Sequence, residues 1–149
     1  MVILRLRNIR YQYHDGTCAL QGVSLDILKG EFLAILGQNG SGKTTLLKHL
    51  NGLLKPAAGE VVLGQMPLRQ YPEREVFQKV GMVFQDPNDQ LFAPSVWDDV
   101  AFGPMNLGLP KNEVAQRVEE ALSLVEMRSH TDKAVDALSF GQKKRVCIA

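Results

Sequence analysis

The chain has 149 residues, of which 45% are hydrophobic and 22% charged, proportions that are typical of a soluble globular domain and exclude a disordered chain. Its 17 basic and 16 acidic side chains leave a net charge of +1, which argues against a protein that holds nucleic acid by neutralising phosphates. Cys18, Cys147 and the three histidines show no metal-ligand spacing, and no stretch approaches the about 20 apolar residues of a membrane helix. We therefore expect one domain with reduced thiols and no structural metal, able to serve a membrane only from its side.

The first 36 residues predict β-strands. Val2–Arg7 and Val23–Leu28 alternate between apolar and polar residues, as half-exposed antiparallel strands do. Glu31–Leu36 ends in a continuous apolar run, which is typical of a strand covered on both faces. A glycine-rich stretch then interrupts the pattern, and leucines at helical spacing predict a helix over Thr44–Leu54.

Shorter elements follow. Glu60–Leu63 and Val80–Phe84 read as strands, the second of them buried, with a short helix over Tyr71–Lys79 between them. The stretch from 85 to 110 is rich in Pro, Asn, Asp and Gly. The clearest helix is Lys111–Val125, and another begins at Phe140. The first half is therefore strand-rich around one strand–loop–helix unit, and the second half is largely helical.

Residues 37–44, GQNGSGKT, match the pattern G-x-x-x-x-G-K-[ST]. Gly37 and Gly42 let the backbone turn so that its N–H groups face inward toward an anion, and the helix that follows adds its positive end. Lys43 can reach the β and γ phosphates, and the Thr44 hydroxyl can hold Mg²⁺. The expected nucleotide-binding residues are Gly37, Gln38, Asn39, Gly40, Ser41, Gly42, Lys43, Thr44 and Thr45. The pattern predicts a site for a nucleoside triphosphate with Mg²⁺, and the absence of an NKxD tetrapeptide disfavours a GTP switch.

Five features occur in an order that resembles the ATP-binding subunit of an ABC transporter. They are Tyr13, residues 37–44, Gln85, QDPNDQLF at 85–92 and LSFGQKKRV at 138–146. The resemblance implies that Tyr13 stacks on adenine, with Tyr11 as a rival; alternatively Tyr13 is a half-buried strand tyrosine. It also implies that Gln85 reaches Mg²⁺ or the attacking water, so that Lys43 and Gln85 are catalytic and Mg²⁺ lies at Thr44 and Gln85. The alternative for Gln85 is a solvated glutamine before a turn.

Residues 138–142 resemble the family signature LSGGQ, with a phenylalanine in place of the first glycine. The signature residues are Leu138, Ser139, Phe140, Gly141 and Gln142. Ser139 and Gln142 also have the spacing of a capping box, which predicts a helix start at this point. In the family this helix start faces the γ-phosphate held by a second copy. We expect Lys143, Lys144 and Arg145 on or near the exposed side of the helix.

The resemblance implies an α/β P-loop NTPase fold of the ABC type, with an N-terminal antiparallel β subdomain and a helical subdomain. The whole of 1–149 is then the N-terminal part of one ATP-binding domain, with a RecA-like and β core over about 1–85 and 136–149 and a helical subdomain over about 86–135. The family places two carboxylates and a switch histidine after the signature. No residue here matches them, since Asp132 and Asp136 precede the signature. We expect a chain without its C-terminal part that binds ATP but loses most hydrolysis.

The stretch from 85 to 109 looks most like the cobalt/nickel and energy-coupling-factor branch of ABC importers, although an ordinary polar loop is the alternative. This resemblance implies a subunit that couples ATP and Mg²⁺ to import of a metal ion such as cobalt or nickel, or of a vitamin. The partners are a transmembrane subunit and a second ATP-binding subunit, with no nucleic acid, at the cytoplasmic face of the cell membrane. Phe92, Trp97 and Phe102 suit either the partner surface or the core. Two other functions stay open: a soluble ABC-type ATPase acting on nucleic acid or ribosomes, and a non-hydrolysing regulator.

Overall fold

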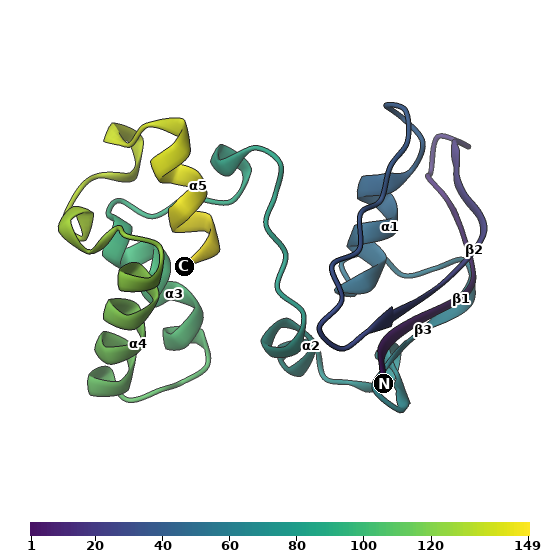
Figure 1. Cartoon of the computed structure of the whole chain (residues 1–149), viewed down its shortest axis with the longest axis horizontal. Helices are drawn as coiled ribbons and strands as arrows, with labels where there is room; N and C mark the ends of the chain where they lie inside the picture. Colours follow the sequence, from purple (N-terminus) through teal and green to yellow (C-terminus); the bar gives the residue numbers. More distant parts are fainter. The chain divides into compact units, whose positions relative to one another are not determined.

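The computed structural model describes residues 1–149 and divides them into two compact units, residues 1–81 and residues 82–149. Figure 1 shows the strands with α1 and α2 in the first unit, and α3, α4 and α5 in the second. Each unit has its own hydrophobic cluster. None of the helices is both long enough and apolar enough to cross a bilayer.

The first unit is built on one antiparallel sheet with the strand order β2-β1-β3-β4. The strands are β1 (Val2–Gln12), β2 (Cys18–Leu28), β3 (Ala58–Leu63) and β4 (Met66–Pro67). A tight turn joins β1 to β2, with the Tyr13 N–H donating to the Thr17 carbonyl at 2.9 Å. The antiparallel β part expected from the alternating apolar residues is confirmed.

The sheet buries the apolar face of β1 against the helices of the same unit. Leu4 and Leu6 are buried at the period-two spacing of a strand, and Ile9 is buried after an irregularity in the strand pairing between Leu6 and Ile9. The helical elements are α1 (Lys43–Leu50), the 3₁₀ turn η1 (Leu68–Gln70) and α2 (Glu73–Lys79). Leu46 and Leu50 of α1 and Val76 of α2 complete the cluster. The core therefore packs against α1, the helix that directly follows the glycine-rich loop.

The second unit is helical. Its elements are η2 (Pro87–Asp89), α3 (Val96–Asn106), α4 (Lys111–Leu124), η3 (Arg128–His130), η4 (Val135–Ala137) and α5 (Phe140–Ile148). Helices α3 and α4 lie side by side (Figure 1) and pack Val96 and Ala101 against Val114, Val118 and Leu122. Four of the predicted helices are present within a few residues of their expected bounds.

Two predictions of strands are wrong. Residues 31–36 and 80–84 form no strand, and Phe32 and Leu36 are 105% and 89% exposed. A strand needs hydrogen bonds from a neighbour, and no other segment of this chain pairs with either stretch. The apolar run at 31–36 is the kind of sequence that a buried strand requires, but most of its side chains are exposed here.

Helix α3 was not predicted from the sequence. Ser95 caps it by accepting a hydrogen bond from the Asp98 N–H at 3.1 Å, so an S-x-x-D start was present among the Pro and Gly residues.

Residues 136–149 pack into the second unit through Leu138 and Val146. Their expected grouping with residues 1–85, apart from a helical subdomain at 86–135, stays a prediction.

Candidate functional site

The glycine-rich loop leads directly into α1 and leaves the start of this helix free. Gly42 is the N-cap and lies in the left-handed region at φ 87°, as does Gly40 at φ 80°. No side chain caps α1, and its first turn holds no acidic residue. The first N–H groups of the helix are therefore available, and the helix dipole adds positive potential where they point. An anion is the natural ligand of this helix start.

Gly42 is required by close packing as well as by its backbone angle. A Cβ built at this position would lie 2.5 Å from the carbonyl oxygen of Ala19 in β2. A side chain would therefore collide with the main chain of the sheet. The contact between loop and sheet fixes where α1 begins, which explains why glycine stands directly before the lysine.

The side chain of Lys43 folds back over the loop that precedes it. Its ammonium group donates to the carbonyl oxygens of Gly37 and Gln38 at 2.8 and 2.6 Å, and to the Ser41 hydroxyl at 3.4 Å. The loop thus holds a full positive charge at its centre. A phosphate group that enters the loop would meet this ammonium group together with the free N–H groups of α1.

Tyr13 lies beside the same helix. Its hydroxyl shares a hydrogen bond of 2.8 Å with the hydroxyl of Thr45, and its ring is 38% exposed. Tyr11 packs edge-on against both Tyr13 and the buried His49, at ring-centroid distances of 5.0 and 4.8 Å. Tyr11 therefore serves the core, while Tyr13 keeps a ring face that a base could stack on. Stacking of adenine on Tyr13 stays a prediction.

Mg²⁺ is the metal that the loop is expected to hold. Thr44 is exposed, and its hydroxyl makes no hydrogen bond within the chain. A free hydroxyl next to a phosphate site suits Mg²⁺, which binds through a few protein oxygens together with phosphate and water. No group of three or more His, Cys, Asp or Glu side chains forms a further metal site.

Gln85 belongs to the second unit, in a stretch that we call the Gln85 segment, residues 84–90. Its side chain is exposed and has no hydrogen-bond partner, so its amide can reach a ligand. The backbone of the segment is tightly held: Asp86 accepts from the Asn88 N–H at 2.9 Å, and Pro87 is fully buried. The backbone of the Gln85 segment is therefore held in place, whereas the Gln85 side chain is free to move.

The signature residues begin α5, as predicted. Ser139 accepts from the Gln142 N–H at 3.3 Å, and Gln142 Oε1 accepts from the Ser139 N–H at 2.9 Å, which confirms the capping box. Leu138 is buried in the core of the second unit. Phe140 is 61% exposed, and Gly141 has open space where a Cβ would stand. The exposed glycine and phenylalanine are therefore the parts of the signature that a ligand can approach.

Lys143 and Lys144, which we expected with Arg145 on or near the exposed side of the helix, are half-buried, and both form hydrogen bonds within the second unit. Lys144 donates to the carbonyl oxygens of Phe84 and Gln85, and Lys143 donates to the Asn88 side chain at 2.8 Å. Both lysines therefore hold the Gln85 segment against α5, and only Arg145 is exposed. The basic run showed three charges, but their positions around the helix could not reveal which carbonyl groups would lie opposite.

Two ionisable groups near α5 have shifted pKa values. Burial raises the pKa of the Asp99 carboxyl, and the N–H groups of Phe92 and Ala93 oppose that rise. Burial also raises the pKa of the Cys147 thiol, against the opposing charge of Lys144. Asp99 Oδ2 is buried without a hydrogen-bond partner. The sequence did not predict a shifted pKa for either Asp99 or Cys147.

An exposed aromatic pair lies at α3. Phe92 and Phe102 contact each other edge-on at 4.7 Å and are 66% and 47% exposed, and Met105 is also exposed. Trp97, by contrast, packs against the core. Of the three aromatic residues that the sequence offered for a partner surface, two are accessible.

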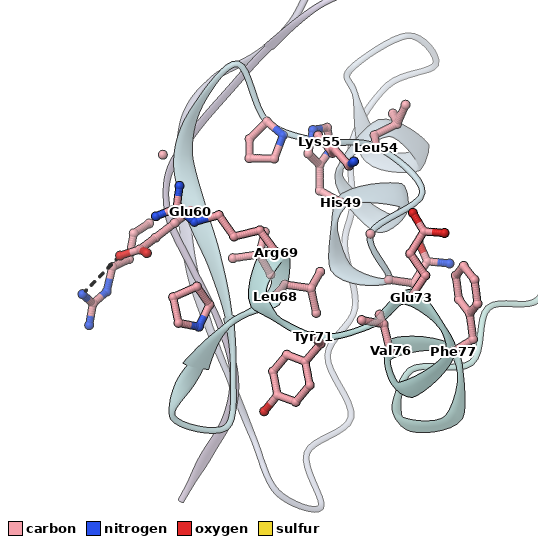
Figure 2. Close-up of a pocket in the computed structure, with 17 residues that line it drawn as sticks. His49, Leu54, Lys55, Glu60, Leu68, Arg69, Tyr71, Glu73, Val76 and Phe77 are labelled. Carbon is pink, nitrogen blue, oxygen red and sulfur yellow. Dashed lines mark ion pairs between the residues drawn. The ribbon is translucent and has the colours of Figure 1, made fainter.

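The first unit also contains a cavity of about 590 Å³ that the sequence did not predict. Figure 2 shows Glu60 of β3 on one side and Glu73, Val76 and Phe77 of α2 on the other. His49 lines it, and although fully buried its Nε2 has no hydrogen-bond partner. None of residues 37–45 lines this cavity, so it is separate from the loop described above.

Comparisons with known proteins bear on these features. A family model described as "ABC transporter" matches residues 20–149. The energy-coupling factor transporter ATP-binding protein EcfA of Methanothermobacter thermautotrophicus is 52% identical over 150 residues, 99% of this chain and 48% of that relative. The chain spans about half the length of the curated relatives it matches.

Two solved structures are similar along almost the whole chain. CbiO1 from Clostridium perfringens, described as part of the ABC transporter complex CbiONQ, has a TM-score of 0.85 and 44% identity over 99% of this chain and 59% of its own. A dimeric ATP-binding cassette in a post-hydrolysis state, bound to ADP and Pi, has a TM-score of 0.83 and 29% identity, covering 97% and 67%. The fold class predicted from the sequence is confirmed by both.

Proposed function

Because the chain belongs to the ABC transporter family, we propose that residues 37–45 and Tyr13 bind ATP with Mg²⁺. The observation that carries this proposal is the uncapped start of α1 with the Lys43 ammonium group held over the loop. Binding moves Lys43 from the loop carbonyls to the β and γ phosphates. The exposed ring of Tyr13 stacks on the adenine, and the free hydroxyl of Thr44 is the protein ligand of Mg²⁺.

We propose further that Gln85 and the signature act on the same chemistry from the second unit. The free amide of Gln85 reaches Mg²⁺ or the attacking water. The start of α5, with Gly141 open to approach, contacts the γ-phosphate of an ATP held by another ATP-binding subunit. These roles follow the family motifs, and the exposure of both groups supports them.

The physiological role we propose is ATP-driven import of a small solute, a metal ion such as cobalt or a vitamin, through a transmembrane partner. The similarity to an energy-coupling factor subunit and to CbiO1 supports this branch. The exposed pair of Phe92 and Phe102, with Met105, offers an apolar contact for that partner, which would bring the chain to the cytoplasmic face of the membrane. These 149 residues alone bind ATP without efficient turnover, since none of them matches the water-polarising carboxylates of the family.

Nucleotide binding is tested by calorimetry with MgATP on Lys43→Met and, as a matched control, Lys29→Met, whose side chain is exposed and forms no ion pair. Loss of charge-assisted hydrogen bonds is expected to weaken binding by about 10- to 100-fold in the first variant only. Equal affinity of Lys43→Met and the native chain would refute the assignment of the loop. ATPase rates of this chain and of a longer one that includes the family carboxylates test the turnover statement, and equal rates would contradict it.

The partner is tested by co-purification with an energy-coupling factor transmembrane subunit. Phe102→Ser is expected to reduce recovery, whereas Leu124→Ser, an equally apolar exposed position on α4, is not. Recovery of ribosomes or DNA in place of the membrane subunit would favour the soluble ATPase alternative.

A further inference from the structure

The Gln85 segment is fastened to α5 at its start and in its middle. The Lys144 ammonium group donates to the carbonyl oxygens of Phe84 and Gln85 at 2.7 and 2.5 Å. One helical position earlier, Lys143 donates to the Asn88 Oδ1 at 2.8 Å. All three bonds join residues that are more than 50 positions apart in the sequence. Their arrangement therefore depends on the fold of the second unit, not on a local turn.

The end of the segment is attached to the same helix. The Gln90 amide donates to the carbonyl oxygen of Cys147 at 2.8 Å, and its Oε1 accepts from the Phe84 N–H at 3.1 Å. Gln90 thereby links the two ends of the Gln85 segment to each other, and it also attaches the segment to the last turn of α5. Of the contacts that do this, the pair made by Lys144 is the only one that grips the peptide groups on both sides of Gln85.

Lys144 is well suited to this role. Its ammonium group forms no ion pair within the chain, so both of its bonds to carbonyl groups are charge-assisted and uncontested. The Phe140 ring lies one helical turn before it, with its centroid 5.9 Å from the ammonium nitrogen. Phe140 stands where the family signature usually has glycine, and its ring limits the positions that the Lys144 side chain can take.

We propose that Lys144 is a positioning residue that locks the backbone of Gln85 to the signature helix. Gln85 and Gly141 then move as one body, so that contact of the signature with a phosphate is transmitted to the group that reaches Mg²⁺. This inference rests on the proposed function for the role of Gln85, but the lock itself is a property of the second unit without nucleotide. The Phe140 ring supports the lock, because the Lys144 ammonium group lies over it.

Hydrogen exchange of the 149-residue chain without nucleotide tests the lock, using Lys144→Met, Lys144→Arg and the matched control Lys111→Met. Lys111 is exposed and makes no hydrogen bond or ion pair through its side chain. Exchange of the amides at 84–91 should rise about tenfold in Lys144→Met, a change equal to about 1.4 kcal/mol of opening free energy. Lys144→Arg should restore most of the protection, and Lys111→Met should leave it unchanged. Unchanged exchange in Lys144→Met would overturn the proposal.

Exchange in α4 reports whether a variant has lost the fold of the whole unit. If Lys144→Met also opens α4, Lys144→Arg decides, since it keeps the charge that the two carbonyl groups accept from. Protection of 84–91 retained in Lys144→Arg while Lys144→Met loses it supports the lock, and equal loss of protection in both variants refutes it. Phe140→Ala measures only the support that the ring gives to Lys144.

Positioning of Gln85 is measured separately, by titrating Mg²⁺ into the chain at saturating ATP. Lys144→Met and Gln85→Ala should raise the Mg²⁺ dissociation constant to the same extent, with rescue by Lys144→Arg and no change in ATP affinity without metal. An effect of Gln85→Ala alone would refute transmission through Lys144. Absence of ATP binding by the native chain would refute the proposed function and leave the exchange result standing.

Discussion

Replacement of Gly42 by alanine should destabilise the first unit for two separable reasons. A non-glycine residue at φ 87° costs roughly 1 kcal/mol of backbone strain. The new Cβ would also lie 2.5 Å from the carbonyl oxygen of Ala19, so either the loop or β2 has to move. Overpacking of this kind costs about 1–3 kcal/mol, which brings the expected loss in unfolding free energy to roughly 2–4 kcal/mol.

Two other glycines of the same unit separate these terms. Gly40 has a similar φ of 80° but open space at its Cβ position, so Gly40→Ala should cost only the strain of roughly 1 kcal/mol. Gly81 has neither a positive φ nor a neighbour, so Gly81→Ala should stay within about 0.5 kcal/mol of the native chain.

Urea unfolding can be followed for each unit on its own. All three tyrosines of the chain, Tyr11, Tyr13 and Tyr71, lie in the first unit, and the single tryptophan, Trp97, lies in the second. The Gly42→Ala effect should appear in the tyrosine signal and leave the tryptophan signal in place. Equal losses for Gly42→Ala and Gly40→Ala would refute the close approach of the loop to β2, and with it the account of where α1 begins.

Three further predictions concern the second unit and use Trp97 or thiol chemistry as the probe. Because the pKa of Asp99 is raised in the fold, the folded state holds the proton more tightly, and unfolding free energy should fall as pH rises through the window just above 3.8. Asp99→Asn should flatten that dependence, and an unchanged slope would exclude Asp99 as its source. The exposed Cys18 should be alkylated at least about tenfold faster than the buried Cys147 in the native chain, and the two rates should become similar in denaturant. Equal rates in the native chain would contradict the burial of Cys147. Ser139→Ala should lower the tryptophan-detected unfolding free energy by about 1 kcal/mol through loss of the α5 cap, and a neutral result would show that the capping box adds no stability.

Local rules predicted the parts of the fold that depend on neighbours in sequence. The helix after the glycine-rich loop was predicted from the spacing of its leucines, and the capping box was predicted from Ser139 and Gln142, because both patterns depend only on residues that are close in sequence. Strands at 31–36 and 80–84 were not found, since pairing depends on a partner that hydrophobic pattern does not identify. The start of α3 at Ser95 was missed because proline and glycine dominated the surrounding stretch.

The candidate site divides in the same way. The residues of the P-loop could be named from spacing alone, but their state could not: Lys43 is bound to the loop's own carbonyl oxygens. The tie between Lys144 and the peptide groups beside Gln85 crosses about sixty residues and has no local pattern that could have predicted it. The sequence showed that residues 143–145 are basic, but it could not predict which groups each of these side chains would contact.

The internal contacts of Lys43 bear on how strongly this loop can bind a phosphate. A lysine free in solvent would add the whole of its charge-assisted hydrogen bonds to the binding energy, whereas Lys43 first gives up bonds of 2.8 and 2.6 Å to Gly37 and Gln38. In return, the backbone is already turned at Gly42, so little backbone freedom is lost when the anion enters. The exchange of one set of bonds for another is the reason to expect Lys43→Met to weaken MgATP by about 10- to 100-fold and not to abolish binding. The remaining affinity then belongs to the free N–H groups of α1, which the lysine substitution leaves in place.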